Sequence, residues 1–399
     1  MDQSASVGAA ATGPLAGVRV VEVGGIGPGP FACMMFADLG AEVVRIDRPG
    51  GEKLFAGQRL LLHRGRRSIV VDLRHPRGPE VVRRLAARAD IVTEAFRPGV
   101  AERLGIGPGV LLAENPRLVY GRMTGWGQDG PLATTAGHDI DYIAVTGALH
   151  ASGHADTSPQ FPANLLGDFG GGGMLLAVGL LAAVIHARQS GRGQVVDAAI
   201  VDGTALLSTM LHGMMAAGHW RDERGVNQLD GGVPWYDIYR TADARHLAVG
   251  ALEPQFYAEL VRLLGFADDR PENHEPDDHS RLPSRDDPVH WPEIRRRFAE
   301  RFASRTQAEW MTIFDGTDAC VAPVLTMTDA PRHPQLAARD TFVTADGVVQ
   351  PAPAPRFSVS PAALGAAPTG PGAHTRQTLS DWGFGDVNEL IAEGAVVQA

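Results

Sequence analysis

The sequence predicts an α/β protein with an open sheet of parallel strands and a second, smaller region that has its own strands and helices. In the first half of the chain, β-branched runs alternate with stretches of helical spacing. Strands separated by helices pair in parallel through crossovers. The length of 399 residues suits two domains. Because open α/β sheets bind ligands beyond the carboxyl ends of their strands, we expect the chemistry in the loops that follow the strands.

The expected elements of the first half follow in chain order. Runs rich in Val and Ile predict strands at Val18–Val23, Glu42–Asp47, Ser68–Leu73, Ile91–Ala95 and Leu118–Arg122. Helical spacing predicts helices at Phe31–Leu39 and Pro79–Arg88. Between Met174 and about Trp220, two apolar helices flank the strand-like Gly193–Ala198.

The second region runs from about Val233 to Thr328. Its expected strands are Arg245–Leu252 and Ala319–Leu325, and its expected helices are Glu253–Gly265, Trp291–Phe302 and Gln307–Phe314. The stretch Asp268–Asp287 is rich in Asp, Pro and His and predicts a solvated surface loop rather than a metal site. Gln350–Gly372 reads as a linker, and a last helix is expected near Arg376–Leu390.

Composition excludes several classes of protein. With 44% hydrophobic and 21% charged residues, the chain is not disordered, and its net charge of −10 disfavours nucleic acid as a partner. Two cysteines, Cys33 and Cys320, form no disulfide framework. The first residues lack a signal peptide, and the apolar run Met174–Ala187 is too short to span a bilayer. We expect a cytoplasmic protein with no membrane partner and no metal.

The loop Gly24–Pro30 after the first strand resembles a dinucleotide fingerprint, and Asp47 ends the next strand where such folds place a ribose-binding acid. The glycine spacing differs from G-x-G-x-x-G, however. Pro28 and Pro30 also lack the backbone N–H groups that a pyrophosphate needs. A nicotinamide cofactor is therefore disfavoured.

Several arginines occupy positions after the expected strands: Arg48, Arg74, Arg97 and Arg103. Each alone is most simply a solvated surface charge. Together, at one edge of a parallel sheet in an acidic protein, they indicate a local anion site. A nucleotide-like ligand with several phosphates would suit it.

Two further positions carry candidate chemistry. His138 stands between glycine-rich turns and two aspartates, and its simplest interpretation is a salt-bridged surface histidine. Asp168 precedes four glycines and an apolar helix, which fits either an N-cap or a carboxylate beside an oxyanion-binding helix terminus. Capping alone does not require four glycines, because glycine is costly at a helix start.

Taken together, these segments resemble the family III CoA-transferase superfamily (CaiB/BaiF type), and most closely its α-methylacyl-CoA racemase branch. The matching stretches extend over nearly the whole chain: PLAGVRVVEVGGIGPGPFA, DLGAEVVRIDRPGG, FRPGVAERLGIGP, GRMTGWGQDGP, AGHDIDYIAVTGALH, NLLGDFGGGG, GRGQVVDAAIVDG, DGGVPWYDIY, GALEPQFY and GAHTRQTLSDWGF.

The resemblance implies an interlocked homodimer. Each protomer has a Rossmann-like large domain, from residues 1–220 and 329–399, and a small α+β domain at 233–328. The acyl group is expected at the dimer interface, and the CoA arm on the large domain. The implied CoA contacts are Arg48, Val71, Asp72, Leu73, Arg74, Ala95, Phe96, Arg97, Arg103, Gly137, Asp139, Ile140, Asp141 and Tyr142.

The resemblance also assigns His138 and Asp168 as two catalytic bases. Racemisation of a 2-methylacyl-CoA removes the α-proton on one face of the carbon and delivers a proton on the other, so two bases are needed. Backbone N–H groups of the glycine run would hold the enolate oxygen. Asn164, Tyr236 and Glu253 are implied as supporting residues, with Glu253 contributed by the other protomer. No cofactor is implied, since CoA is part of the substrate.

The alternative within the same family is CoA transfer, in which the aspartate that matches Asp168 is a nucleophile. His138 in the motif G-H-D favours the racemase, because the transferase does not need it. The sequence does not indicate which acyl chain the protein prefers. Met174, Met210, Met214 and Met215 could line a tolerant pocket, but are more simply core residues.

Overall fold

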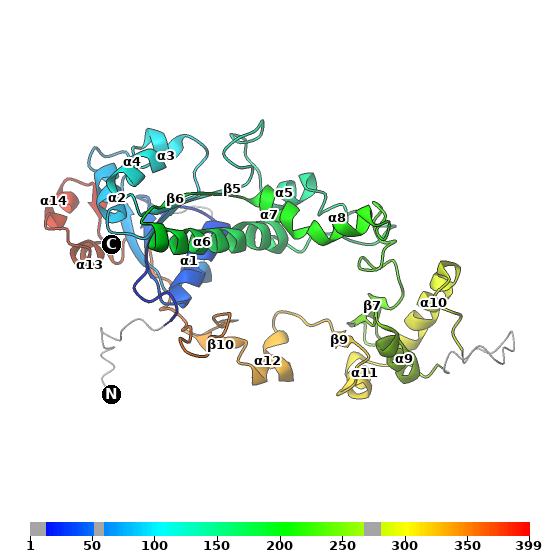
Figure 1. Ribbon diagram of the computed structural model, residues 1–399. Helices are drawn as coiled ribbons and strands as arrows, with labels where there is room; N and C mark the ends of the chain where they lie inside the picture. The colour runs from blue at the N-terminus through cyan, green and yellow to red at the C-terminus, as the bar shows by residue number, and fades with distance from the viewer. Residues whose placement is uncertain (1–12, 52–59, 267–280) are drawn as a thin grey trace, which may run out of the picture. The chain divides into compact units, whose positions relative to one another are not determined.

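The computed structural model describes residues 13–51, 60–266 and 281–399 (Figure 1). The described chain forms two compact units. The first comprises the residues up to Thr146, Pro162–Ser208 and Gln335–Ala399, and the second comprises Gly147–Phe161 and Thr209–Pro334. These bounds differ from the expected ones, because the second unit starts at Thr209 and includes a segment from before residue 162.

One arginine explains why Gly147–Phe161 belongs to the second unit. The Arg224 guanidinium donates to the carbonyl oxygens of His154, His150 and Thr157 at 3.0, 3.3 and 2.6 Å. These backbone acceptors attach the segment to the chain that follows residue 208. Nothing in the pattern of apolar residues indicates such a contact, so the sequence interpretation missed it.

The first unit is built on one seven-stranded sheet. Its order is β12-β3-β2-β1-β4-β5-β6, from strands β1 (Arg19–Val23), β2 (Glu42–Asp47), β3 (Arg67–Val71), β4 (Ile91–Glu94), β5 (Val119–Thr124), β6 (Gln194–Ala199) and β12 (Val396–Val397). The first six strands pair in parallel, as predicted, and the expected positions are confirmed. Strand β12, which the sequence did not predict, joins β3 antiparallel.

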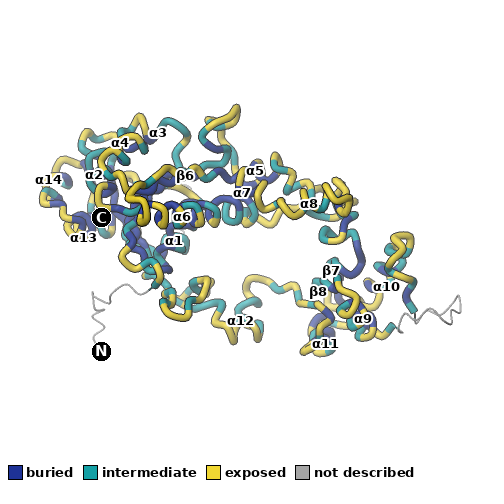
Figure 2. The backbone as a smooth tube through the Cα atoms, viewed as in Figure 1, coloured by how far each residue is buried: buried dark blue, intermediate teal, exposed yellow. Residues whose placement is uncertain are grey.

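Helices cover both faces of this sheet, so its strands are apolar on both sides. One layer contains α1 (Pro28–Asp38) and α6 (Leu175–Ser190), and the other contains α2 (Gly78–Ala86), α4 (Pro108–Glu114), α13 (Thr375–Asp381) and α14 (Val387–Ala392). Val20 faces the first layer, whereas Val21 faces the second, as the alternation of a strand requires. Strands β1 to β5 accordingly form the buried centre of this unit, whereas the edge strand β6 is more exposed (Figure 2).

A long helical run departs from the expectation for the apolar segment. The π-helix η2 (Leu165–Met174) continues directly into α6, and together they span the 26 residues Leu165–Ser190. By length and composition this run could cross a membrane, so the argument that the apolar stretch is too short was wrong. Core helices of soluble proteins pass the same test, and here Leu176 and Leu180 are buried in the core beside the sheet.

Shorter elements complete the first unit. They are η1 (Leu61–His63), α3 (Val100–Arg103), α5 (Asp139–Val145), α7 (Ile200–Leu207), β10 (Phe342–Ala345) and β11 (Val348–Pro351). Strands β10 and β11 form a hairpin whose second strand extends into Gln350–Pro351, the start of the stretch expected to be a linker. The single last helix expected near Arg376–Leu390 is two helices, α13 and α14, because Gly383 turns the chain between them at φ 77°.

The second unit contains a three-stranded antiparallel sheet of β7 (Tyr236–Arg240), β8 (His246–Gly250) and β9 (Val321–Pro323). Its helices are α8 (Thr209–Ala216), α9 (Pro254–Leu263), η3 (Pro288–His290), α10 (Trp291–Phe302), α11 (Gln307–Phe314) and η4 (Ala330–Arg332), with α12 (Pro334–Ala338) at the boundary. Aromatic rings dominate its core, including Tyr239 stacked on Phe302 at 4.9 Å between centroids. Most of the predicted Asp268–Asp287 loop, up to residue 280, lies outside the described residues.

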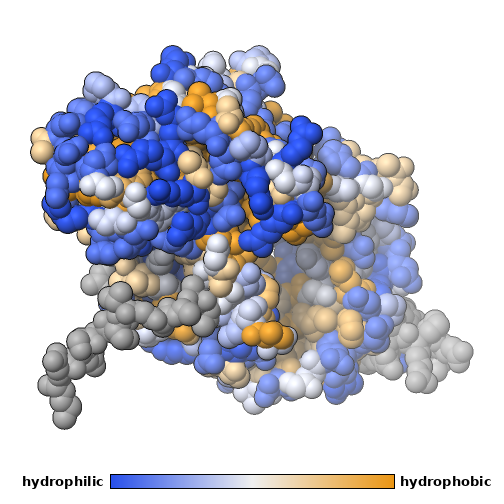
Figure 3. All heavy atoms as spheres, turned by 60° about the vertical axis from the view of Figure 1, so that its left-hand side comes forward, coloured by the Kyte–Doolittle hydropathy of each residue, from blue (hydrophilic) through white to orange (hydrophobic). Residues whose placement is uncertain are grey.

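The face drawn in Figure 3 is mainly hydrophilic, with smaller patches of apolar side chains. This agrees with a chain in which 21% of the residues are charged.

Candidate active site

A pocket of about 620 Å³ opens at the carboxyl ends of strands β1 to β4. Strand order reverses here, because β2 and β3 lie on one side of β1 whereas β4 lies on the other. Open α/β sheets bind ligands at such a reversal, and the volume falls within the usual range for small-molecule sites. The fold therefore forms a pocket at the strand ends, where the sequence predicts ligand binding.

The pocket brings together part of the predicted CoA-binding set. The residues that line it from that set are Arg48, Val71, Asp72, Leu73, Arg74 and Phe96. Ala95, Arg97 and Arg103 do not line it, although Leu104, next to Arg103, does. Arg48 and Arg74 are both exposed, as cations that bind phosphate groups need to be.

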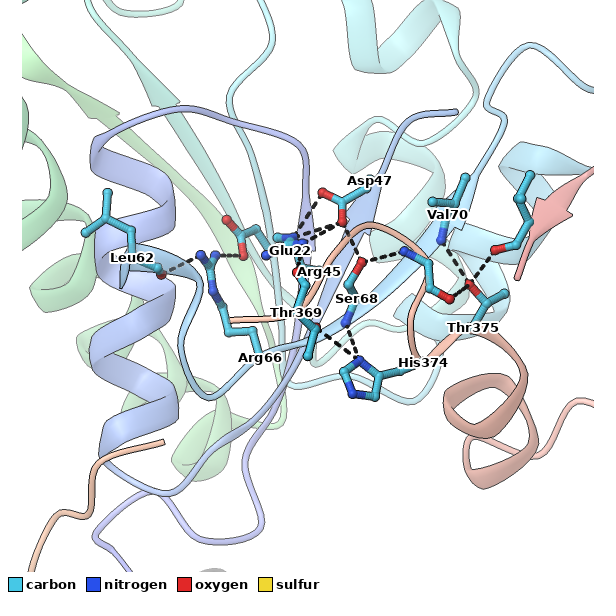
Figure 4. Close-up of polar contacts among 12 residues, drawn as sticks. Glu22, Arg45, Asp47, Leu62, Arg66, Ser68, Val70, Thr369, His374 and Thr375 are labelled. Carbon is cyan, nitrogen blue, oxygen red and sulfur yellow. Dashed lines mark hydrogen bonds and ion pairs between the residues drawn. The ribbon is translucent and has the colours of Figure 1, made fainter. Parts of the chain in front are cut away.

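Buried charges lie beneath this pocket, and the sequence interpretation missed them. Glu22 forms an ion pair with Arg66, which also donates to the Leu62 carbonyl (Figure 4). Glu22 and Leu62 line the pocket, as does His63, where burial and the nearby arginines lower the pKa to about 3. His63 is therefore neutral. A signal was available for Glu22, since it is a charged residue inside the apolar run VRVVEV.

Asp47 is held at the edge of the pocket by the protein itself. Arg45 donates from Nε to both carboxylate oxygens at 2.9 and 3.0 Å, and the Ser68 hydroxyl donates to Oδ2 at 2.6 Å (Figure 4). These hydrogen bonds from Arg45 and Ser68 fix the orientation of the Asp47 carboxylate and use part of its acceptor capacity within the protein.

A second cluster in the same unit contains both predicted bases. His138 is the N-cap residue of α5, and its backbone N–H donates to Oδ2 of Asp141 at 2.9 Å. Asp168 lies in the first turn of η2, where its Oδ2 accepts from the Asn164 side chain at 3.0 Å. Its backbone N–H donates to Oδ1 of Asp139, at 2.6 Å. This hydrogen bond joins residues 29 positions apart in the chain, so the first turn of η2 is fixed to the start of α5.

The surroundings of Asp168 change its affinity for protons. Partial burial raises its pKa, and the charge of Asp139 raises it further, while the hydrogen bond from Asn164 and the charge of His138 lower it. His138 directly precedes Asp139, whose carboxylate accepts the Asp168 N–H, so the two predicted bases lie close together. Tyr142, whose pKa rises to about 12 through burial and the nearby Asp168 and Asp141, stays a neutral phenol.

The four glycines after Asp168 are explained by packing, which corrects one expectation. Gly170–Gly173 lie inside η2, where N–H groups donate to carbonyls five residues earlier, so they are not free to hold an enolate oxygen. A Cβ on Gly171 would come within 2.6 Å of Thr204 Oγ1 in α7, and one on Gly173 within 2.8 Å of the Pro28 carbonyl in α1. The close approach is to neighbouring helices rather than to a ligand.

The glycines in the turn before His138 likewise allow close packing, in this case of the Tyr142 ring against the backbone. A Cβ on Gly125 or Gly137 would lie 2.0 or 2.7 Å from the Tyr142 ring. The Trp126 ring meets Tyr142 edge-on at 4.8 Å between centroids. This packing supports the start of α5 and therefore the position of His138.

The remaining predicted residues lie on α5 and in the second unit. Ile140 is exposed on α5, whereas Tyr236 and Glu253 belong to the second unit, at the start of β7 and at the N-cap of α9. Within the described parts of the chain, no group of three or more His, Cys, Asp or Glu side chains is arranged to hold a metal ion.

Comparison with known proteins settles the family. The model of CoA-transferase family III matches residues 15–375. The chain belongs to CoA-transferase family III. Both the pocket at the strand ends and the His138–Asp168 cluster lie within the matched residues.

Similar family III proteins include α-methylacyl-CoA racemases. The racemase of Mus musculus is 46% identical over 93% of this chain and 93% of its own length. That of Homo sapiens is 46% identical over 93% of this chain and 94% of its own. A crystal structure of a CaiB/BaiF family protein from Brucella suis superimposes with a TM-score of 0.79 at 25% identity, covering 93% of this chain and all of that one.

Proposed function

We propose that this family III protein is an α-methylacyl-CoA racemase that interconverts (2R)- and (2S)-2-methylacyl-CoA thioesters. The observation that carries the proposal is that the start of α5, at His138, is hydrogen-bonded to the first turn of η2, at Asp168, in a chain 46% identical to racemases. A transferase needs a carboxylate nucleophile, but not the histidine beside it.

The geometry suits proton transfer on two faces of one carbon. The raised pKa of Asp168 brings the carboxyl closer to neutral pH, where a group can both accept and deliver a proton. When one base removes the α-proton, the other must be protonated to supply its replacement. The first N–H groups of α5, from Asp139 and Ile140, have no acceptor within that helix and can offer hydrogen bonds to the enolate oxygen.

The pocket at the strand ends suits the CoA arm. Arg48 and Arg74 supply positive charge for phosphate groups, and Val71, Leu73 and Phe96 supply apolar surface. No redox cofactor or metal enters this chemistry, since proton transfer alone converts one epimer to the other.

We further propose that the active enzyme is an interlocked homodimer in the cytoplasm, without a nucleic-acid or membrane partner. Apolar side chains that a lone chain leaves exposed support it: Met174 at the end of η2, Val178 and Ile185 on α6, and Leu206 and Leu207 on α7. An exposed apolar stripe of this kind marks an interface. A second copy would cover it, and would supply Glu253 to the site.

Proton exchange in D₂O tests the activity directly. The purified protein is incubated with one epimer of a 2-methylacyl-CoA and no acceptor acid, while deuterium uptake and the epimer ratio are followed. We expect uptake and convergence on a mixture of both epimers. Absence of uptake over several acyl chains, together with CoA transfer to an added carboxylic acid, would instead establish the transferase with Asp168 as nucleophile.

Substitution of His138 tests the division of labour between the bases. His138→Ala should reduce exchange from one epimer by a factor of about 10² to 10⁴ more than exchange from the other, because each base serves one face. His150→Ala is the control, since this exposed histidine belongs to the second unit. Equal loss for both epimers would contradict the assignment.

A further inference from the structure

Asp139 is a buried carboxylate in direct contact with the backbone of Asp168. Asp139 is only 5% exposed, and its Oδ1 accepts the Asp168 N–H at 2.6 Å. Its Oδ2 is also buried and has no hydrogen-bond partner among the described residues. Burying a carboxylate with one oxygen unsatisfied is costly, so a purely structural role would be better served by a neutral side chain.

The space for this carboxylate is built by glycine. A Cβ on Gly167 would lie 2.6 Å from Oδ1 of Asp139 and 3.0 Å from the Ile143 side chain. The absence of a side chain at position 167 therefore allows α5 and η2 to approach closely enough for the contact to form. The acid and the glycine act as one unit.

We infer that Asp139 is a positioning residue for the Asp168 base: its carboxylate fixes the first turn of η2 against α5 and keeps a second negative charge beside the reacting carboxyl group. The inference rests on the proposed function for its kinetic consequence only.

The groups that face Asp168 define what Asp139 does to it. His138, Asp139 and Tyr142 face Asp168 from the start of α5. The Asn164 side chain donates a hydrogen bond to it, and the uncharged Gly27, in the loop before α1, lies close to its Oδ2. Among the described residues, Asp139 is the acid whose charge raises the pKa of Asp168. Its negative charge favours the protonated form of Asp168, in which the residue delivers a proton.

Asp139→Asn tests the inference, because asparagine keeps an oxygen that accepts the N–H while removing the charge. The pKa of Asp168 should fall, because the negative charge that favours its protonated form is removed. It is measured by NMR titration of protein labelled at the aspartate carboxyl carbons, with Asp168→Asn identifying the resonance. Asp202→Asn, which removes an exposed acid on α7, is the matched control and should leave the titration unchanged.

An unchanged Asp168 titration in folded Asp139→Asn would overturn the inference, as would an equal change in the Asp202→Asn control. If circular dichroism shows that Asp139→Asn is unfolded, Asp139→Ser takes its place, because it also removes the charge and keeps an acceptor. In the exchange assay, the acid limb of the pH profile should move to lower pH for the epimer that Asp168 deprotonates. A wild-type protein without exchange would refute the proposed function but leave the titration result valid.

Discussion

At the scale of single residues, burial decides how carboxylates behave near the site. Glu94 ends β4 and is only 4% exposed, and its Oε2 accepts the Phe96 N–H at 2.6 Å. Burial raises its pKa to about 7, although that hydrogen bond and the charge of Arg122 oppose the change. Glu94 thereby fixes the loop that contributes Phe96 to the pocket, although its own ionised carboxylate is poorly solvated there.

This raised pKa predicts a specific dependence of stability on pH. The pKa of Glu94 in the folded protein exceeds the ordinary value of 4.5. The contribution of Glu94 to the free energy of unfolding is therefore fully present below about pH 4.5 and is lost as pH rises through 7. Glu94→Gln keeps an acceptor oxygen and removes the titration. Between pH 5 and pH 8, the free energy of unfolding of the wild type should fall by about 3 kcal/mol relative to the variant.

Urea unfolding at both pH values measures this difference. Glu389→Gln, which changes an acid in the first turn of the short helix α14, is the control and should follow the wild type. Parallel behaviour of the wild type and Glu94→Gln would show that Glu94 ionises freely in the folded protein.

At the scale of elements, the glycine run determines how three helices meet. Gly171 of η2 and Gly203 of α7 face each other so closely that a Cβ on Gly203 would lie 1.8 Å from the Gly171 carbonyl oxygen. On the other side, Phe31 of α1 packs against Phe169 with 5.0 Å between ring centroids. Asp168 directly precedes Phe169 and lies three residues before Gly171, so helix packing on both sides of η2 sets its position.

Gly171→Ala should therefore lower the free energy of unfolding by about 2–3 kcal/mol, because the new methyl group collides with Thr204. Gly213→Ala is the matched control. It lies within α8 and a Cβ there meets nothing within 4 Å, so the change should stabilise by about 0.5–1 kcal/mol. Denaturant titration measures both, and equal stability of the two variants would contradict close helix packing at Gly171.

At the scale of the whole molecule, the last thirty residues complete a sheet begun at the N-terminus. Ser68 links the two: its hydroxyl binds Asp47 and accepts the Gly372 N–H at 2.8 Å, and its N–H donates to His374 Nδ1 at 3.1 Å (Figure 4). Thr375 accepts the Val70 N–H at 3.2 Å and donates to the Val397 carbonyl at 2.6 Å. The pocket edge at Asp47 thus depends on residues 300 positions away.

Removal of residues 373–399 should prevent stable folding of the first unit. The deletion takes away Leu379, Trp382, Leu390 and Val396, all fully or almost fully buried. At about 2 kcal/mol each, their burial is comparable with the whole net stability of a domain. Removal of residues 398–399 alone should cost less than about 1 kcal/mol. Thermal unfolding and binding of a hydrophobic dye compare the two, and cooperative unfolding of the longer deletion would refute the expectation.

The sequence by itself determined the parallel sheet, the helices between its strands and the family, because β-branched runs, helical spacing and the motifs are local properties of the chain. It also singled out His138 and Asp168. Only the tertiary structure decided the rest. It showed that the glycine run packs against α1 and α7, and that Asp47 is occupied by Arg45 and Ser68. It also showed β12 joining β3 and Arg224 fixing Gly147–Phe161. Each of these contacts joins residues distant in the chain or hides a charge among apolar neighbours. The free energy of these contacts depends on which groups meet in space, and the periodicity of residues along the chain does not indicate which groups those are.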